Sequence, residues 1–223
     1  MNSRAFTLAG VELSARASGA LWWPARSVLV VSDLHLGKSE RIARAGGAML
    51  PPYETRDTLA RLDAEIAALG PRMVVCLGDS FDDAAVADGL AEDAVLWLTR
   101  LMAGRAWVWI EGNHDPGPVG LGGAHMADLP LAPLTFRHIA RPGASAEVSG
   151  HYHPTATVRT RGRQVSRPCF LHDSDRVILP AFGTYTGGLR CTSPVLTGLM
   201  RPEALAILTG PVPQVIPMPG RSQ

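Results

Sequence analysis

The chain has 223 residues, of which 46% are hydrophobic and 18% charged; this composition excludes a disordered polypeptide, and the length suits one α/β domain over residues 1–223. The net charge of +1 excludes a general electrostatic attraction to nucleic acid, although a local basic patch remains possible. The N-terminus lacks a signal-peptide pattern and no apolar stretch approaches the roughly 20 residues of a membrane span, so we expect a soluble cytoplasmic protein without a membrane partner.

The first half of the chain alternates between strand and helix patterns. Strands are indicated by continuous β-branched runs, and helices by apolar residues spaced three and four apart. In chain order we expect an edge hairpin over the first twenty or so residues, a strand at 27–32, a helix ended by Gly70-Pro71, a strand at 72–77, a helix at about 88–102 and a strand at 106–110. Connections of this βαβαβ kind predict a parallel core.

After residue 116 the chain is rich in glycine and proline, and short strands replace the helices. We expect these strands to be antiparallel additions to the core, with His172 in a turn and the tail from about residue 211 extended or frayed. The expected strands lie at 134–139, 146–149, 156–160, 165–170 and 176–179.

Four short polar motifs follow the apolar runs. They are Asp33-Leu34-His35, Gly78-Asp79, Gly112-Asn113-His114-Asp115 and Gly150-His151-Tyr152-His153. Their carboxylate, amide and imidazole groups are ligands for hard or borderline divalent cations. Because ligands of open α/β sheets bind at the carboxyl ends of strands, the motifs predict one pocket that holds two metal ions.

Spacing within the motifs supports this interpretation. Asp33 and His35 are two residues apart, as are His151 and His153, and such side chains point the same way on an extended segment. The two oxygens of Asp79 would allow it to bridge two ions. Two cations about 3.5–4 Å apart would hold a phosphate and activate a hydroxide for attack on phosphorus. His114, next to the ligand Asn113, is the expected general acid.

The order of the four motifs resembles the calcineurin-like metallophosphoesterase superfamily. The resemblance implies a two-sheet αββα sandwich, with mixed sheets around the parallel βαβ core, and a dinuclear centre of manganese, or else of iron or zinc. It implies that Asp33, His35 and His153 bind the first metal, that Asp79 bridges, and that Asn113 and His151 bind the second. The catalytic residues would be His114, Asp79 and Asn113.

The superfamily has one further histidine on the second metal, and here either His125 or His138 would supply it. His138 ends the apolar segment 134–138 and so shares the strand-end position of the other ligands, whereas His125 follows two glycines. We therefore favour His138.

Longer segments resemble a bacterial subgroup, the ligase-associated DNA damage response endonucleases of the PdeM type. The matching segments are Leu36-Gly37-Lys38, residues 50–55, residues 78–83 and residues 180–189. The resemblance implies a DNA-repair setting beside an ATP-dependent DNA ligase, a helicase and a nuclease. Asp82 stands where this subgroup is expected to have a histidine, while Asp83 is retained.

Other residues are candidates for contact with substrate. Arg41 and Arg44 follow the first motif and would reach phosphate, while Tyr53 and Tyr185 would stack on a base. Arg159, Arg161, Arg163 and Arg167 cluster on an expected hairpin, which is either a phosphate-binding element or a solvated turn.

The sequence thus predicts a metal-dependent phosphodiesterase or endonuclease that acts on DNA or on a nucleotide phosphodiester. One alternative is a pyrophosphatase of nucleotides or nucleoside diphosphate-sugars. An alternative of another class is a catalytically silent scaffold that keeps the fold, which the full set of metal-binding residue types argues against.

Overall fold

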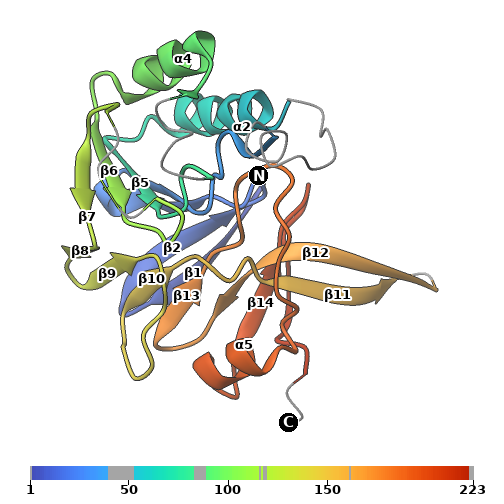
Figure 1. Cartoon of the computed structure of the whole chain (residues 1–223). Coiled ribbons are helices and arrows are strands. Elements are labelled where there is room, and N and C mark those ends of the chain that lie inside the picture. The colour runs from blue at the N-terminus through green and yellow to red at the C-terminus, as the bar shows by residue number, and fades with distance from the viewer. Residues whose placement is uncertain are drawn as a thin grey trace.

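Two mixed β-sheets lie face to face, with helices on the outer side of each (Figure 1). The computed structural model describes residues 2–39, 53–82, 89–115, 117, 120–160 and 162–220. One apolar core joins the inner faces of the two sheets, and Leu21, Val75 and Phe136 are among its fully buried members. The chain therefore has the αββα sandwich expected from its sequence.

The first sheet is a hairpin joined to a parallel array. Its strands, in spatial order, are β1 (Ser3–Leu8), β2 (Val11–Arg16), β3 (Leu21–Trp23), β4 (Val28–Val31), β5 (Met73–Leu77), β6 (Ala106–Ile110) and β7 (Ala124–Met126). β1 to β4 are antiparallel, and a short 3-10 helix, η1 (Pro24–Arg26), precedes β4. β4 to β7 pair in parallel, which places their carboxyl ends along one edge.

Two helices cover the outer face of this sheet. α2 (Glu54–Leu69) connects β4 to β5, and α4 (Glu92–Met102) connects β5 to β6. α2 buries Leu59, Leu62 and Ile66 because these residues fall on one stripe at helical spacing. It ends at Gly70, which adopts a left-handed conformation with φ of 57°. The βαβαβ prediction is confirmed.

The second sheet forms the other half of the sandwich. Its main path runs β15 (Gln214–Pro217), β14 (Leu205–Leu208), β12 (Arg163–His172), β13 (Arg176–Ile178), β10 (Glu147–Ser149), β9 (Leu134–Arg137) and β8 (Asp128–Leu131), and β11 (Thr155–Thr160) pairs with β12. Helix α5 (Pro194–Leu199) packs on its outer face through Leu196.

Two expectations for the second half were wrong. β10 pairs in parallel with β9 and β13 rather than antiparallel, because the connections bring each strand back in the same direction, whereas β11 and β13 pair antiparallel with β12 as expected. His172 lies at the end of β12 and pairs with Val177 and Leu205 instead of forming a turn. α5 and the strands β7, β8 and β14 were not anticipated, whereas the extended tail is confirmed as the edge strand β15.

Membrane insertion finds no support in the helices. In the described part of the chain, no helix combines the length and the apolar character needed to cross a bilayer.

Candidate metal centre

The candidate ligands gather where strands of both sheets end. Asp33 and His35 follow β4, Asp79 follows β5, and Asn113 follows β6 in the first sheet. From the second sheet, His138 follows β9, and the residues 151–153 follow β10. The site therefore lies at the junction of the two sheets rather than on one sheet edge.

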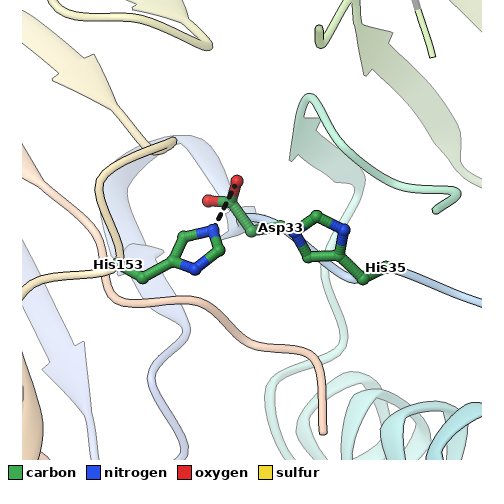
Figure 2. Close-up of side chains that lie close together, drawn as sticks. All are labelled: Asp33, His35 and His153. Atoms are coloured by element: carbon green, nitrogen blue, oxygen red, sulfur yellow. Dashed lines mark ion pairs between the residues drawn. The ribbon is translucent and has the colours of Figure 1, made fainter. Parts of the chain in front are cut away.

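The first group of possible ligands contains Asp33, His35 and His153, whose ligand atoms all lie within 4.8 Å of one another. Figure 2 shows Asp33 between the two rings, with His153 turned toward it. Nε2 of His153 lies 3.1 Å from Oδ1 of Asp33, which is fully buried. Nε2 of His35 is buried without a hydrogen-bond partner among the described residues. This donor set fits a divalent cation.

The second group contains Asp79, His138 and His151, again with ligand atoms within 4.8 Å of one another. Oδ1 of Asn113 joins it, 3.0 Å from Nε2 of His138. The same Nε2 lies 3.2 Å from Nδ1 of His151 and 3.4 Å from Oδ2 of Asp79. Nδ1 of His138 is 4.0 Å from Oδ1 of Asp33, so the two groups are adjacent.

A cation also fits the chemistry of the second group. His138 donates its Nδ1–H to the carbonyl of Leu77 at 2.7 Å, so the neutral ring presents a lone pair at Nε2. That lone pair faces two acceptor oxygens, from Asp79 and Asn113. Three electron-rich atoms this close repel one another unless a cation or a proton lies among them.

The directions of two pKa shifts show that positive charge is favoured next to the buried carboxylates. Burial lowers the pKa of His138, but the hydrogen bond to Asp79 and the charges of Asp33 and Asp79 outweigh it, so the pKa rises above 6.5. Burial raises the pKa of Asp33, but His153 outweighs it, and the pKa falls below 3.8. Since metal ligands must be deprotonated, a bound cation would displace the protons held here.

The convergence of the ligands depends on left-handed backbone rather than on extended strand. Asp33, His35, Asp79, His151 and His153 have φ of 54°, 46°, 45°, 70° and 45°. Such conformations are uncommon for residues other than glycine and concentrate at functional sites. They send His151 to the second group and His153 to the first, so these two residues do not form the convergent pair that an extended segment would give.

Three glycines that open the motifs make room for ligands from other motifs. A Cβ on Gly78 would overlap the ring of His138, and one on Gly112 would overlap the backbone N of Asp79. A Cβ on Gly150 would lie 2.7 Å from Oδ2 of Asp33. The motifs therefore interlock, which sequence reasoning did not reveal.

A second layer of contacts fixes the imidazole rings. His153 donates Nδ1–H to the carbonyl of Gly187 at 3.1 Å, which leaves Nε2 for a metal. Nδ1 of His35 lies 3.0 Å from Oδ1 of the buried Asp82, although the pair falls outside hydrogen-bond geometry. Sequence reasoning had left Asp82 without a role. Its place in the Gly-Asp motif, three residues after Asp79, was the available signal.

His114 lies beside the second group. Its backbone N–H donates to Oδ1 of Asp79 at 2.9 Å, and its Nδ1–H donates to the carbonyl of Asp82 at 3.0 Å. Its Nε2 is 4.0 Å from Oδ2 of Asp79, and 41% of the side chain is exposed. The ring is thus oriented by its Nδ1 and accessible from solvent, as a group that exchanges protons with a substrate must be.

Of the two histidines that could complete the second group, only His138 belongs to it, and His125 belongs to neither group. His125 lies on β7 and stacks on Trp109 with ring centroids 6.4 Å apart. Tyr53 is 65% exposed and borders a cavity of about 330 Å³ that no candidate ligand lines. Tyr185 is 43% exposed, two residues before Gly187. Arg41 and Arg44 lie outside the described residues.

Comparison with known proteins identifies a family and a similar solved structure. The family model for calcineurin-like phosphoesterase matches residues 26–160, a span that includes every candidate ligand. Among solved structures, the nuclease MPE of Pseudomonas putida is similar, with a TM-score of 0.73 and 30% identity over 96% of this chain and 100% of that chain. No curated protein sequence matches at a significant level.

Proposed function

The chain belongs to the calcineurin-like phosphoesterase family, and we propose that within this family it is a nuclease that hydrolyses phosphodiester bonds of DNA. The observation that carries the proposal is the pair of adjacent ligand groups at the junction of the sheets. The likeness to a nuclease over nearly the whole length of both chains supports a nucleic-acid substrate.

We assign Asp33, His35 and His153 to a first metal ion and Asn113, His138 and His151 to a second, with Asp79 between them. Manganese is the proposed metal, with iron or zinc as alternatives that the imidazole ligands would also accept. Two bound cations supply Lewis-acid charge to the phosphoryl oxygens and lower the pKa of water at the site.

His114 is the proposed general acid. In its protonated form, Nδ1–H remains on the carbonyl of Asp82, while Nε2–H is free to reach the leaving oxygen of the substrate. The backbone N–H of His114 holds one carboxylate oxygen of Asp79, which fixes the position of that ligand relative to the ring. Tyr185, Tyr53, Arg41 and Arg44 are proposed to contact the substrate, because they lie in or next to the sequence segments that carry the resemblance.

We also propose a cytoplasmic DNA-repair setting, in association with an ATP-dependent DNA ligase, a helicase and a nuclease. The support is the resemblance of the longer sequence segments to the ligase-associated endonucleases. One of these segments, 180–189, contacts the first ligand group, since the N–H of Gly183 donates to the carbonyl of Asp33 at 3.0 Å.

Metal-dependent turnover tests the proposal directly. With manganese, the purified protein should hydrolyse bis-p-nitrophenyl phosphate and cut DNA oligonucleotides, and a chelator should abolish both activities. A panel of nucleotide-sugars in parallel would reveal a pyrophosphatase instead. If none of these substrates is hydrolysed in a metal-dependent way, an enzymatic function is refuted.

A histidine pair provides the matched control. His138→Ala should remove metal from the second group and abolish turnover, whereas His125→Ala should leave metal content and rate unchanged, because His125 stacks on Trp109 away from the ligands. Equal effects of the two substitutions would contradict the ligand assignment.

A further inference from the structure

A two-stranded arm, formed by β11 and β12, projects from the second sheet (Figure 1). β11 and β12 pair in antiparallel register from Thr155 opposite Pro168 to Thr160 opposite Arg163. Among the described strands, β11 pairs with no partner but β12, and the other partners of β12 begin at Cys169. The paired residues 155–160 and 163–168 therefore project as a ribbon, and we call the stretch 155–168 the arm.

The arm carries a concentrated positive charge. It contains four arginines, at positions 159, 161, 163 and 167, and the stretch 154–172 contains neither aspartate nor glutamate. The chain as a whole is nearly neutral, with 21 basic and 20 acidic residues. The arm therefore creates a local field that the overall charge conceals.

The arginines described in detail are available to a partner. Arg159 and Arg167 are both exposed. Within the part of the chain that the structure describes, neither forms an ion pair with a carboxylate. Arg159 is opposite Gln164 and Arg167 is opposite Ala156, so the two arginines lie on opposite faces of the ribbon, because successive side chains alternate. Both faces can therefore meet phosphate.

The arm is joined to the catalytic centre at its base. Thr155 lies two residues after His153, and its backbone N–H donates to the carbonyl of Leu189 at 2.8 Å. Thr155 also forms an isolated β-bridge with Arg190, which is exposed. Arg190 lies three residues after Gly187, whose carbonyl accepts the hydrogen bond from His153. Arg190 therefore adds a positive charge at the base of the arm.

The distance from the base of the arm to Arg159 bears on the size of the substrate. Arg159 lies four residues beyond Thr155, which corresponds to about 14 Å along the strand. That distance spans about four nucleotides of one strand of duplex DNA. A small nucleotide diester at the metal centre would not reach Arg159, whereas a polymer would.

We propose that the arm holds the sugar–phosphate backbone of a DNA substrate several nucleotides away from the bond being cut. This inference rests on the proposed nuclease function and adds to it the path that the DNA backbone follows along the protein. The arginines bind through charge and hydrogen bonds to phosphate, so the contact is independent of base sequence.

The test removes two charges from the arm. In Arg159→Ala/Arg167→Ala, the KM for an oligonucleotide of about 30 nucleotides should rise roughly five- to twenty-fold. Single-stranded and duplex forms of this oligonucleotide are measured in parallel. The slope of log affinity against log salt concentration should fall by about 1.4 to 1.8, since each lost phosphate contact accounts for about 0.7 to 0.9. Turnover of bis-p-nitrophenyl phosphate should not change.

The matched control is Arg4→Ala/Arg72→Ala, which removes two exposed charges from β1 and from the opposite, amino end of β5. Equal DNA cleavage and salt slope in the arm variant and the control would overturn the proposal and leave the nuclease function intact. A parallel loss on bis-p-nitrophenyl phosphate would also overturn it, since the arm would then support the centre itself. If the unaltered protein hydrolyses this small diester but neither binds nor cuts DNA, both proposals fail.

Discussion

Asp82 contacts the imidazole rings of both His35 and His114 through different atoms. Its carboxylate Oδ1 lies 3.0 Å from Nδ1 of His35, and its backbone carbonyl accepts Nδ1–H of His114 at 3.0 Å. One buried residue thus orients a proposed metal ligand and the proposed general acid. Because only the first contact uses the side chain, substitutions of Asp82 separate the two effects.

We expect Asp82→Ala to lower the affinity of the first ligand group for manganese by roughly 10- to 100-fold, the usual cost of losing a contact behind a metal-bound histidine. Asp82→Asn should have a smaller effect, since its amide keeps an oxygen of similar size beside Nδ1 of His35. Metal titration by calorimetry would measure both. Equal losses in the two variants would show that the contact to His35 is not what matters.

His114→Ala should slow turnover by roughly 100- to 10,000-fold, the range expected when a general acid is lost. Metal content, measured by elemental analysis after dialysis, should stay near that of the unaltered protein, because the ligands of both groups remain. The defect should be smaller for substrates with a good leaving group, such as bis-p-nitrophenyl phosphate, than for DNA. Loss of metal in this variant would make His114 a ligand instead.

Gly150→Ala tests the interlocking of the motifs. The added methyl group would overlap Oγ of Ser32 and press on Oδ2 of Asp33 at 2.7 Å. We expect a free energy of unfolding lower by about 1–3 kcal/mol, typical of overpacking, together with weaker metal binding at the first group. Chemical denaturation and metal titration would measure the two effects.

Gly198→Ala is the matched control. Gly198 lies in α5, where a Cβ would meet nothing within 4 Å. The alanine should raise the free energy of unfolding by about 0.5–1 kcal/mol, because glycine is unfavourable inside a helix. If Gly150→Ala is less stable but binds metal as tightly as the unaltered protein, Asp33 tolerates the displacement that the added methyl group causes.

The first half of the fold and most members of the two candidate ligand groups were predictable from sequence, because both depend on local patterns. Runs such as residues 28–31 are apolar since parallel strands are buried on both faces, and metal-binding residue types follow them directly. His138 could be preferred over His125 for the same reason, and only His138 lies with the second group.

The directions of strands in the second sheet and the backbone conformations of the candidate ligands were not predictable from the sequence. The parallel pairing of β10 with β9 and β13 depends on the paths of the connections between these strands, which no local pattern records. The convergence of Asp33 and His35 was expected for the wrong reason, since both residues are left-handed rather than extended. The contact of Asp82 with His35 likewise depends on tertiary structure.

The second sheet contains a histidine whose titration is independent of the metal centre. His172 ends β12, and its ring packs against that of Phe6 at a tilt of 35°, with centroids 4.6 Å apart. Burial lowers the pKa of His172 below 6.5, and the nearby charge of Asp173 opposes this only in part. The folded protein therefore prefers the neutral ring, while the unfolded chain protonates it at the ordinary pKa.

This difference predicts how stability depends on pH. Below the unfolded pKa of about 6.5 the unfolded state binds more protons at His172, so the stabilising contribution is complete above that pH and is lost as the pH falls through the folded pKa. Replacement by phenylalanine keeps the packing against Phe6 and removes the titration. Urea unfolding of both proteins with chelator, at about pH 7.5 and about pH 5.5, should show the free energy of unfolding of the unaltered protein falling relative to His172→Phe at the lower pH. The comparison cancels the other histidines, which both proteins share. A difference between the two proteins that stays constant with pH would mean that His172 titrates equally in the folded and unfolded states.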